Sequence, residues 1–205
     1  MRLIFIGPQA SGKGTQSEIV AKNFGIAHIS LGEILRNYSG KHKNEIKKII
    51  ATGKLIPLDW SLKIIEERIS KKDCKKGFIL DGFPRNIEQA KGLDKITLID
   101  QVVEIFISDR EAIRRLKGRW VCPKCEINYN ILTEPKPKFD KICDVDGSKL
   151  VHRTDDNHTA IKKRLKIYHK DTEPLLEFYK NKLVKINGNQ HIDEVKDEIL
   201  EKLRS

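Results

Sequence analysis

The stretch Gly7-Pro8-Gln9-Ala10-Ser11-Gly12-Lys13-Gly14-Thr15 decides the fold of this 205-residue chain. It follows an apolar run at residues 3–6 and precedes a segment with helical periodicity. A glycine, four further residues and then Gly-Lys, placed between a strand and a helix, let backbone N–H groups converge on phosphate oxygens. The helix N-terminus and the lysine favour the same anion. We predict a phosphate-binding loop, for which a glycine-rich turn without a ligand is the alternative. The expected contacts are Ala10, Ser11, Gly12, Lys13, Gly14 and Thr15.

A carboxylate ends another apolar strand. Asp81 follows the run at residues 77–80, and the turn Gly82-Phe83-Pro84-Arg85 comes directly after it. Ligands bind at the carboxyl ends of parallel strands, so this turn delivers an arginine to the edge that carries the phosphate loop. Asp81 and Thr15 are the predicted residues for Mg²⁺, held through water. An isolated aspartate after a strand is more often a turn residue.

Hydrophobic periodicity predicts five short strands alternating with helices. The expected strands cover residues 3–6, 26–29, 77–80, 101–107 and 183–186. The expected helices cover residues 13–23, 31–37, 44–51, 60–70, 111–117, 157–170, 173–182 and 191–203. This alternation is typical of an α/β fold, with a five-stranded parallel sheet covered by helices on both faces.

Composition narrows the class of protein. Hydrophobic residues make up 39% and charged residues 34% of the chain, as in globular proteins. No apolar run approaches the roughly 18 residues needed to span a membrane. Residues 1–7 are too short for a signal peptide and read as a strand, so we expect a cytoplasmic protein. The net charge of +11 suits anionic partners, although most of the lysines fit solvated helix faces.

Residues 119–153 replace helical periodicity with turns, prolines and three cysteines. Cys122 with Cys125 and Cys143 with Asp146 form two paired turns, which can hold Zn²⁺ tetrahedrally. Asp144 is a less well-spaced alternative to Asp146, and free thiols or a disulfide are alternatives to the metal. Because all four ligands would come from the protein, the zinc would be structural.

Two residues of reactive type stand outside these motifs. Cys74 is a lone thiol to which we assign no function. His28 lies in an expected strand, and we interpret it as a packed core residue.

Taken together, the motifs resemble those of the adenylate kinase family over essentially the whole chain and in the expected order. The similar stretches are the loop continuing into Lys13-Gly14-Thr15-Gln16, Gly53-Lys54-Leu55-Ile56-Pro57, Asp81-Gly82-Phe83-Pro84-Arg85 with Gln89, the pair Arg115 and Arg119, and Arg153, Asp155 and Asp156 followed by Arg164-Leu165.

This resemblance implies a domain organisation. A P-loop NTPase-type core would comprise residues 1–29, 60–118 and 154–205. A helical monophosphate-binding insert would cover residues 30–59, and a zinc-ribbon lid would cover residues 119–153. The reaction would be reversible transfer of the γ-phosphoryl group of Mg-ATP to AMP, which yields two ADP. We expect a monomer.

The resemblance also assigns roles. The implied catalytic residues are Lys13, Arg85, Arg119, Arg153 and Arg164. Beyond the phosphate loop, ATP would contact Arg115, Arg119, Asn128, Tyr129 and Gln190. AMP would contact Leu31, Arg36, Lys54, Leu55, Ile56, Gly82, Phe83, Pro84, Arg85, Gln89, Arg153 and Arg164. This concentration of cations suits phosphoryl transfer, which depends on positioning and on neutralising dispersed negative charge.

Two positions depart from the family pattern. Ala10 stands where the family usually has glycine, and Leu31 stands where it commonly has a threonine near the AMP base. Gln89 can still hydrogen-bond an adenine edge, so we predict that AMP is preferred over CMP, UMP and GMP. The alternatives are a kinase for CMP or UMP, a slow P-loop switch, and a zinc-ribbon protein that binds nucleic acid.

Overall fold

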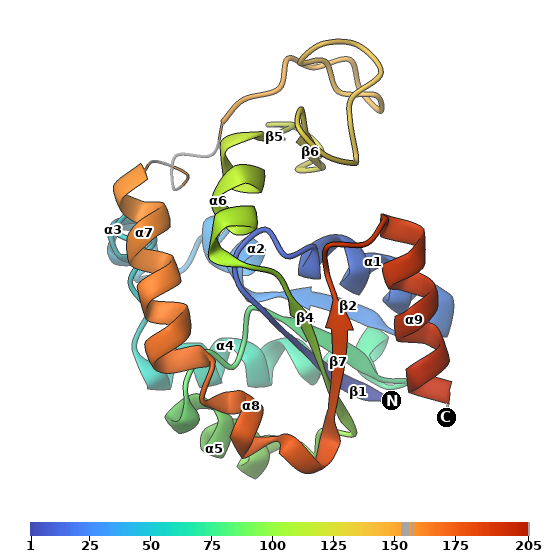
Figure 1. Cartoon of the computed structure of the whole chain (residues 1–205). Coiled ribbons are helices and arrows are strands. Elements are labelled where there is room, and N and C mark those ends of the chain that lie inside the picture. The colour runs from blue at the N-terminus through green and yellow to red at the C-terminus, as the bar shows by residue number, and fades with distance from the viewer. Residues whose placement is uncertain (153–155, 157, 205) are drawn as a thin grey trace.

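The computed structural model describes residues 1–152, 156 and 158–204. Its centre is a five-stranded sheet in the order β2-β3-β1-β4-β7, in which every neighbouring pair is parallel (Figure 1). The strands are β1 (Arg2–Ile6), β2 (Ala27–Ser30), β3 (Phe78–Asp81), β4 (Gln101–Phe106) and β7 (Leu183–Asn187). The predicted α/β fold and all five predicted strands are confirmed, with each bound shifted by at most one residue.

Strand β1 lies in the middle of the sheet, between β3 and β4. Its register places Ile4 opposite both Leu80 and Val102. The chain leaves β1 at the carboxyl edge and turns there into the phosphate loop, while Asp81 ends the neighbouring strand at the same edge. Parallel pairing therefore brings the loop and the carboxylate together from distant parts of the sequence.

Alternation along β1 explains the two packed layers. Leu3 and Phe5 face a core shared with α1 (Lys13–Phe24) and α9 (Ile192–Arg204), which cover one face of the sheet. Ile4 and Ile6 face the opposite core, shared with α4 (Leu58–Ile69), α5 (Ile87–Ile96) and α8 (Leu175–Phe178). All four β1 side chains are at most 2% exposed, so both faces of the strand are sealed from water.

The remaining helices are α2 (Leu31–Arg36), α3 (Lys43–Ala51), α6 (Asp109–Lys117) and α7 (His158–Ile167). Helix α5 was not predicted from the sequence. Its expected helix at residues 157–170 ends earlier and continues as a π-helical turn, Tyr168–Thr172. Its expected helix at residues 173–182 is only α8 plus the 3₁₀ turn Lys180–Lys182. No helix in the described part of the chain is both long and apolar enough to cross a membrane.

The lid is a small separate lobe beyond the carboxyl edge of the sheet (Figure 1). It contains the antiparallel strands β5 (Arg119–Val121) and β6 (Asn128–Asn130) and a small core around Cys122, Tyr129 and Leu150. Helices α2 and α3, from the expected monophosphate insert, pack on the core through Leu31, Leu35 and Ile46.

We predict that Gly77→Ala destabilises the protein by at least about 2 kcal/mol, because a side chain there would be both strained and obstructed. Gly77 has φ +135°, and a Cβ would lie 1.9 Å from the carbonyl oxygen of Met1. Urea denaturation measures the change. The matched control is Gly25→Ala, where φ is +64° and a Cβ would meet nothing within 4 Å. Its expected cost is about 1 kcal/mol, and equal losses in the two variants would contradict the close approach at Gly77.

Candidate functional site

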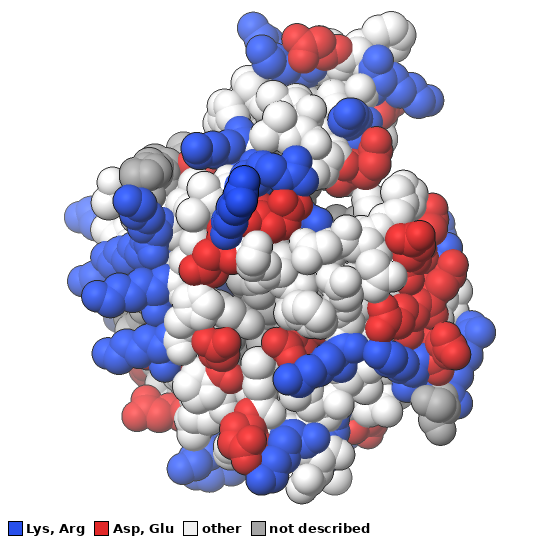
Figure 2. Space-filling model, in the orientation of Figure 1, with Lys and Arg blue, Asp and Glu red and all other residues white. Residues whose placement is uncertain are grey.

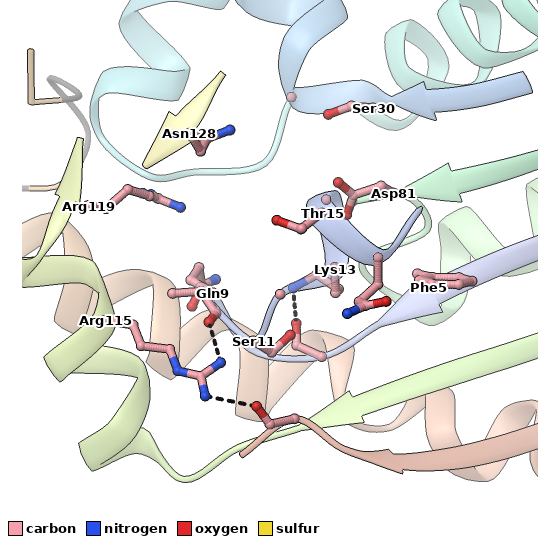
Figure 3. A pocket seen from close by; sticks show the side chains of 18 of the residues that line it. Phe5, Gln9, Ser11, Lys13, Thr15, Ser30, Asp81, Arg115, Arg119 and Asn128 are labelled. Carbon is pink, nitrogen blue, oxygen red and sulfur yellow. Dashed lines mark hydrogen bonds between the residues drawn. The ribbon is translucent and has the colours of Figure 1, made fainter. Parts of the chain in front are cut away.

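A cavity of about 250 Å³ opens at the carboxyl edge of the sheet. Its floor is the phosphate loop, and its walls come from the β3 turn, α6, the lid and α7 (Figure 3). Every residue predicted to contact ATP lines it. These residues are Ala10, Ser11, Gly12, Lys13, Gly14, Thr15, Arg115, Arg119, Asn128, Tyr129 and Gln190.

Lys13 closes the phosphate loop on itself. Its Nζ donates to the carbonyl oxygens of Gly7 and Pro8, each at 2.7 Å. Burial lowers the pKa of Lys13 to about 8, and nearby arginines, with Arg85 foremost, reinforce that shift against the attraction of Asp81. The ammonium is thus held among other cations, where an anion would be strongly favoured.

The loop reaches its shape at a conformational cost. Ala10 has φ +60°, the left-handed region that favours glycine. At Gly7, with φ +152°, a Cβ would lie 2.2 Å from the carbonyl oxygen of Ile105, so the loop needs a glycine there to approach β4. The departure at Ala10 is therefore tolerated by the backbone, while Gly7 admits no side chain.

Asp81 and Thr15 lie beside each other at the cavity, as the magnesium prediction requires (Figure 3). The carboxylate of Asp81 also faces His28, with Nε2 and Oδ2 3.9 Å apart. Burial opposes ionisation of Asp81, but His28 and Lys13 hold its pKa below the usual range. Burial likewise opposes protonation of His28, but Asp81 raises its pKa overall. His28 is 19% exposed and lines neither cavity, as expected of a packed strand residue, but its contact with Asp81 places it beside the site.

The Arg85 turn is fixed by three hydrogen bonds. Arg85 Nε donates to the carbonyl oxygen of Gly82 at 2.9 Å, and its backbone N–H donates to Gln89 Oε1 at 2.8 Å. Thr172, from the π-helical turn, donates to the Arg85 carbonyl at 2.8 Å. Gly82 has φ +79°, which the tight turn requires. The guanidinium thus projects from a rigid backbone into the cavity wall.

Arg115 joins three segments of the chain. Its Nε donates to Glu111 at 2.7 Å, its Nη2 to the Gly188 carbonyl at 2.8 Å and its Nη1 to the Ala10 carbonyl at 3.5 Å (Figure 3). Hydrogen bonds from Arg114, and to a smaller extent from Arg115, lower the pKa of Glu111 to about 2. Arg115 is therefore a fixed planar cation at the rim of the phosphate loop, suited to stacking on a base.

Asp156 gathers two of the predicted catalytic arginines. Its carboxylate accepts from Arg119 Nε at 2.7 Å and from Arg164 Nη1 at 3.3 Å, and its side chain is 2% exposed. Arg119 belongs to the lid and Arg164 to α7. The aspartate thus holds two cations from different segments at the cavity.

A second, smaller cavity of about 70 Å³ adjoins the first. The apolar part of its wall comes from the expected monophosphate insert, with Leu31, Leu35, Ile50, Leu55 and Ile56. Lys54 and Gln89 complete its rim. The two cavities share Arg36, Arg85 and Arg164, so a row of three arginines separates an apolar pocket from the phosphate loop.

Four side chains in the lid could hold a metal ion. The ligand atoms of Cys122, Cys125, Cys143 and Asp146 all lie within 4.8 Å of one another. Four ligands around one Zn²⁺, with Zn–S near ~2.3 Å, require spacings of this size. Backbone N–H groups of Lys124 and Cys125 point at Cys122 Sγ. The geometry favours Asp146 over Asp144, whose side chain instead accepts from the Lys138 N–H.

Three predicted site residues differ in placement from the rest. Phe83 is 1% exposed and packs in the core rather than at either cavity. Tyr129 lines the cavity, but its hydroxyl lies 3.6 Å from Cys143 Sγ and accepts from the Asp144 N–H, so its tip supports the metal cluster. Arg153, with the neighbouring Asp155, falls outside the described residues.

Sequence reasoning missed several lining residues. Gln9, inside the loop, donates to the Arg164 carbonyl at 3.3 Å, and its position in the motif could have indicated it. Tyr168 and Thr172 come from the π-helical turn and carry no motif that would mark them.

Comparison with known proteins agrees with this geometry. The sequence profile described as Adenylate kinase matches residues 5–184. The chain belongs to the adenylate kinase family.

Several members are similar over almost their whole length. The adenylate kinase of Caldanaerobacter subterraneus subsp. tengcongensis is 43% identical over 97% of this chain and 94% of its own. That of Caldicellulosiruptor bescii is 41% identical over 99% of both chains, and that of Staphylococcus epidermidis is 41% identical over 98% of both. These relatives are enzymes, and the five-stranded parallel sheet flanked by helices is consistent with the adenylate kinase fold.

We predict that Asp156→Asn lowers the free energy of unfolding by about 3 kcal/mol, because it removes the buried negative charge that two partly buried arginines share. Denaturation without nucleotide measures the loss. The control is Asp193→Asn, whose side chain is 67% exposed and pairs with Lys196. It should change stability by less than about 0.5 kcal/mol. If Asp156→Asn were equally mild, the carboxylate would not organise the arginines.

Proposed function

We propose that the protein transfers the γ-phosphoryl group of Mg-ATP reversibly to AMP, giving two ADP. The observation that carries this proposal is the row of arginines shared by the two cavities. A single nucleotide site would need cations only around the phosphate loop. Arginines that face the loop on one side and an apolar pocket on the other suit two nucleotides placed phosphate to phosphate.

The chain's own residues would perform distinct parts of this reaction. Lys13 and the loop N–H groups would hold the donor phosphates, and Asp81 with Thr15 would hold Mg²⁺ through water, where it neutralises charge on those phosphates. Arg36 and Arg85 would hold the acceptor phosphate. Arg119, Arg164 and Arg153 would surround the transferring group, and a closed lid would exclude water as a competing acceptor.

The proposed acceptor base rests on the orientation of Gln89. Its Oε1 accepts from the Arg85 N–H at 2.8 Å, and its Nε2 donates to Ser61 Oγ at 3.4 Å. Ser61 is available as an acceptor because its own hydroxyl donates to the Leu58 carbonyl at 2.8 Å. A flipped amide would lose both bonds, so the side chain has one orientation. One oxygen lone pair and one N–H remain for a ligand.

That remaining pair suits an amino group next to a ring nitrogen acceptor. Adenine and cytosine present this pattern. Guanine and uracil present the reverse order, a carbonyl oxygen next to a ring N–H, and would match the same amide only with the ring turned over. The apolar wall around Leu31 and Ile50 would then favour the larger base of the two. We therefore propose AMP as the preferred acceptor.

The lid cluster supports structural zinc as a second part of the proposal. The four ligand atoms can surround one ion, and the lid core is otherwise small. The nucleic-acid alternative has weaker support, because the side of the lid seen in Figure 2 carries acidic and basic side chains side by side. A monomeric state and a cytoplasmic location remain predictions from sequence.

We predict rapid ADP formation from Mg-ATP that depends on AMP, with kcat/KM in the order AMP, then CMP, then GMP and UMP. A coupled assay of ADP measures it. Arg85→Ala should lower kcat/KM by at least about tenfold, or ~1.4 kcal/mol. The control Arg114→Ala removes an arginine that is 49% exposed and bound to Glu111, and should change it less than about twofold.

Other results of this assay would select the alternatives. Slow hydrolysis of ATP without AMP would indicate a switch, and no turnover would leave a binding protein. A higher kcat/KM for CMP, UMP or GMP would overturn the proposed acceptor.

We predict about one Zn²⁺ per chain in protein produced with zinc available. Cys143→Ser should reduce the zinc content to well below half and lower the melting temperature, because the lid core loses its link between the two turns. Elemental analysis and thermal denaturation measure both effects. The control is Cys74→Ser, since this buried cysteine lies outside the cluster and should leave the zinc content unchanged.

A further inference from the structure

The two cysteine turns of the lid are built alike but differ at one position. In the first turn the N–H of Glu126 donates to the Cys122 carbonyl at 3.0 Å, and in the second the N–H of Gly147 donates to the Cys143 carbonyl at 3.0 Å. Both residues adopt left-handed backbone, with φ +61° and φ +69°. The turn therefore demands a conformation that suits glycine, and the second turn has one.

Glu126 is the costly choice for this position. A side chain at positive φ is strained relative to glycine. Unlike asparagine or aspartate, glutamate does not offset this strain with a short local hydrogen bond to the backbone. A compensating contact should therefore involve its side chain.

That contact crosses to the expected monophosphate insert. Both carboxylate oxygens of Glu126 accept from Asn37 Nδ2, Oε1 at 3.1 Å and Oε2 at 3.4 Å. Asn37 ends α2, and its own N–H donates to the Glu33 carbonyl at 3.0 Å. The amide of Asn37 is thus held at the end of a helix, and the carboxylate of Glu126 is held on the first cysteine turn of the lid.

Asn37 lies next to a residue that lines both cavities. It directly follows Arg36, which lines both cavities. Asn128, two residues beyond Glu126, lines the donor cavity (Figure 3). A hydrogen bond between Asn37 and Glu126 therefore joins the wall of the second cavity, the proposed acceptor site, to the part of the lid that lines the first cavity, the proposed donor site.

We propose that Glu126 is a positioning residue that couples the donor and acceptor sites by binding Asn37 across the cleft. This inference rests on the proposed function. When the acceptor phosphate holds Arg36, Asn37 is placed to hold the lid, so AMP strengthens the binding of ATP. Linkage makes the effect reciprocal.

The test measures binding rather than turnover. The dissociation constant of the β,γ-imido analogue of ATP, with Mg²⁺, is determined by calorimetry with and without saturating AMP, on zinc-loaded full-length protein. The ratio of the two constants is the coupling factor. For Glu126→Ala we expect that factor to fall roughly threefold, as removal of one partly exposed charged hydrogen bond allows, with little change in affinity for either nucleotide alone.

Glu126→Gly separates this role from a purely structural one. It removes the strain along with the contact, so the melting temperature should rise while the coupling factor falls as in Glu126→Ala. A residue that only stabilised the lid would not raise the melting temperature and lower the coupling factor in the same variant. Unchanged coupling in both variants would overturn the proposal.

A reciprocal exchange provides the rescue. Asn37→Asp should weaken coupling, because two carboxylates then face each other. Adding Glu126→Gln should restore it, since the new amide donates to the new carboxylate. Failure of the double variant to recover would also overturn the proposal. If the unaltered protein bound the ATP analogue but not AMP, the proposed function itself would fail.

Discussion

Positive charge concentrated at the carboxyl edge of the sheet is the constraint on which the rest of this structure depends. Burial and the neighbouring guanidinium groups lower the pKa of Lys13 to about 8. Asp81 lies against the loop and Asp156 holds Arg119 and Arg164, so two carboxylates partly balance the cations. Charge of one sign gathered in a partly desolvated cavity is costly unless an anion enters it. The site is therefore arranged in advance for phosphate.

Local features of this arrangement could be predicted from the sequence. The phosphate loop, its lysine and its flanking strand and helix lie within one contiguous stretch, and each strand carries its own apolar run. Helix α5 was missed because Gly92 interrupts its pattern. A Cβ at that glycine would lie 2.6 Å from Leu62, so the glycine serves close packing of α5 on α4. Tertiary packing there outweighs helix propensity.

Contacts between distant segments could not be predicted in the same way. His28 looked like an ordinary strand residue, and only the pairing of β2 with β3 brings it to Asp81. Thr172 carries no motif, yet it supports the Arg85 turn from 87 positions away. The metal ligands were predictable because each pair is local, whereas the hydroxyl of Tyr129 beside Cys143 depends on how the ribbon folds. Sequence spacing indicates neighbours along a turn but not partners across a sheet.

In the proposed function, Leu31 shifts the recognition of the acceptor base onto other residues. Its apolar side chain can pack against a ring but offers no hydrogen bond, so the direction of the base depends on Gln89. Gln89 is oriented by the backbone N–H of Arg85, and Arg85 also presents its guanidinium to the cavity shared by both proposed nucleotides. A shift of the Arg85 turn would therefore disturb base and phosphate together. Buried hydrogen-bond networks of this kind gain specificity because a ligand that mispairs with one member leaves a polar group unsatisfied. In the proposed function, Leu31 thus makes recognition of the acceptor base depend more strictly on the same turn that would hold the acceptor phosphate.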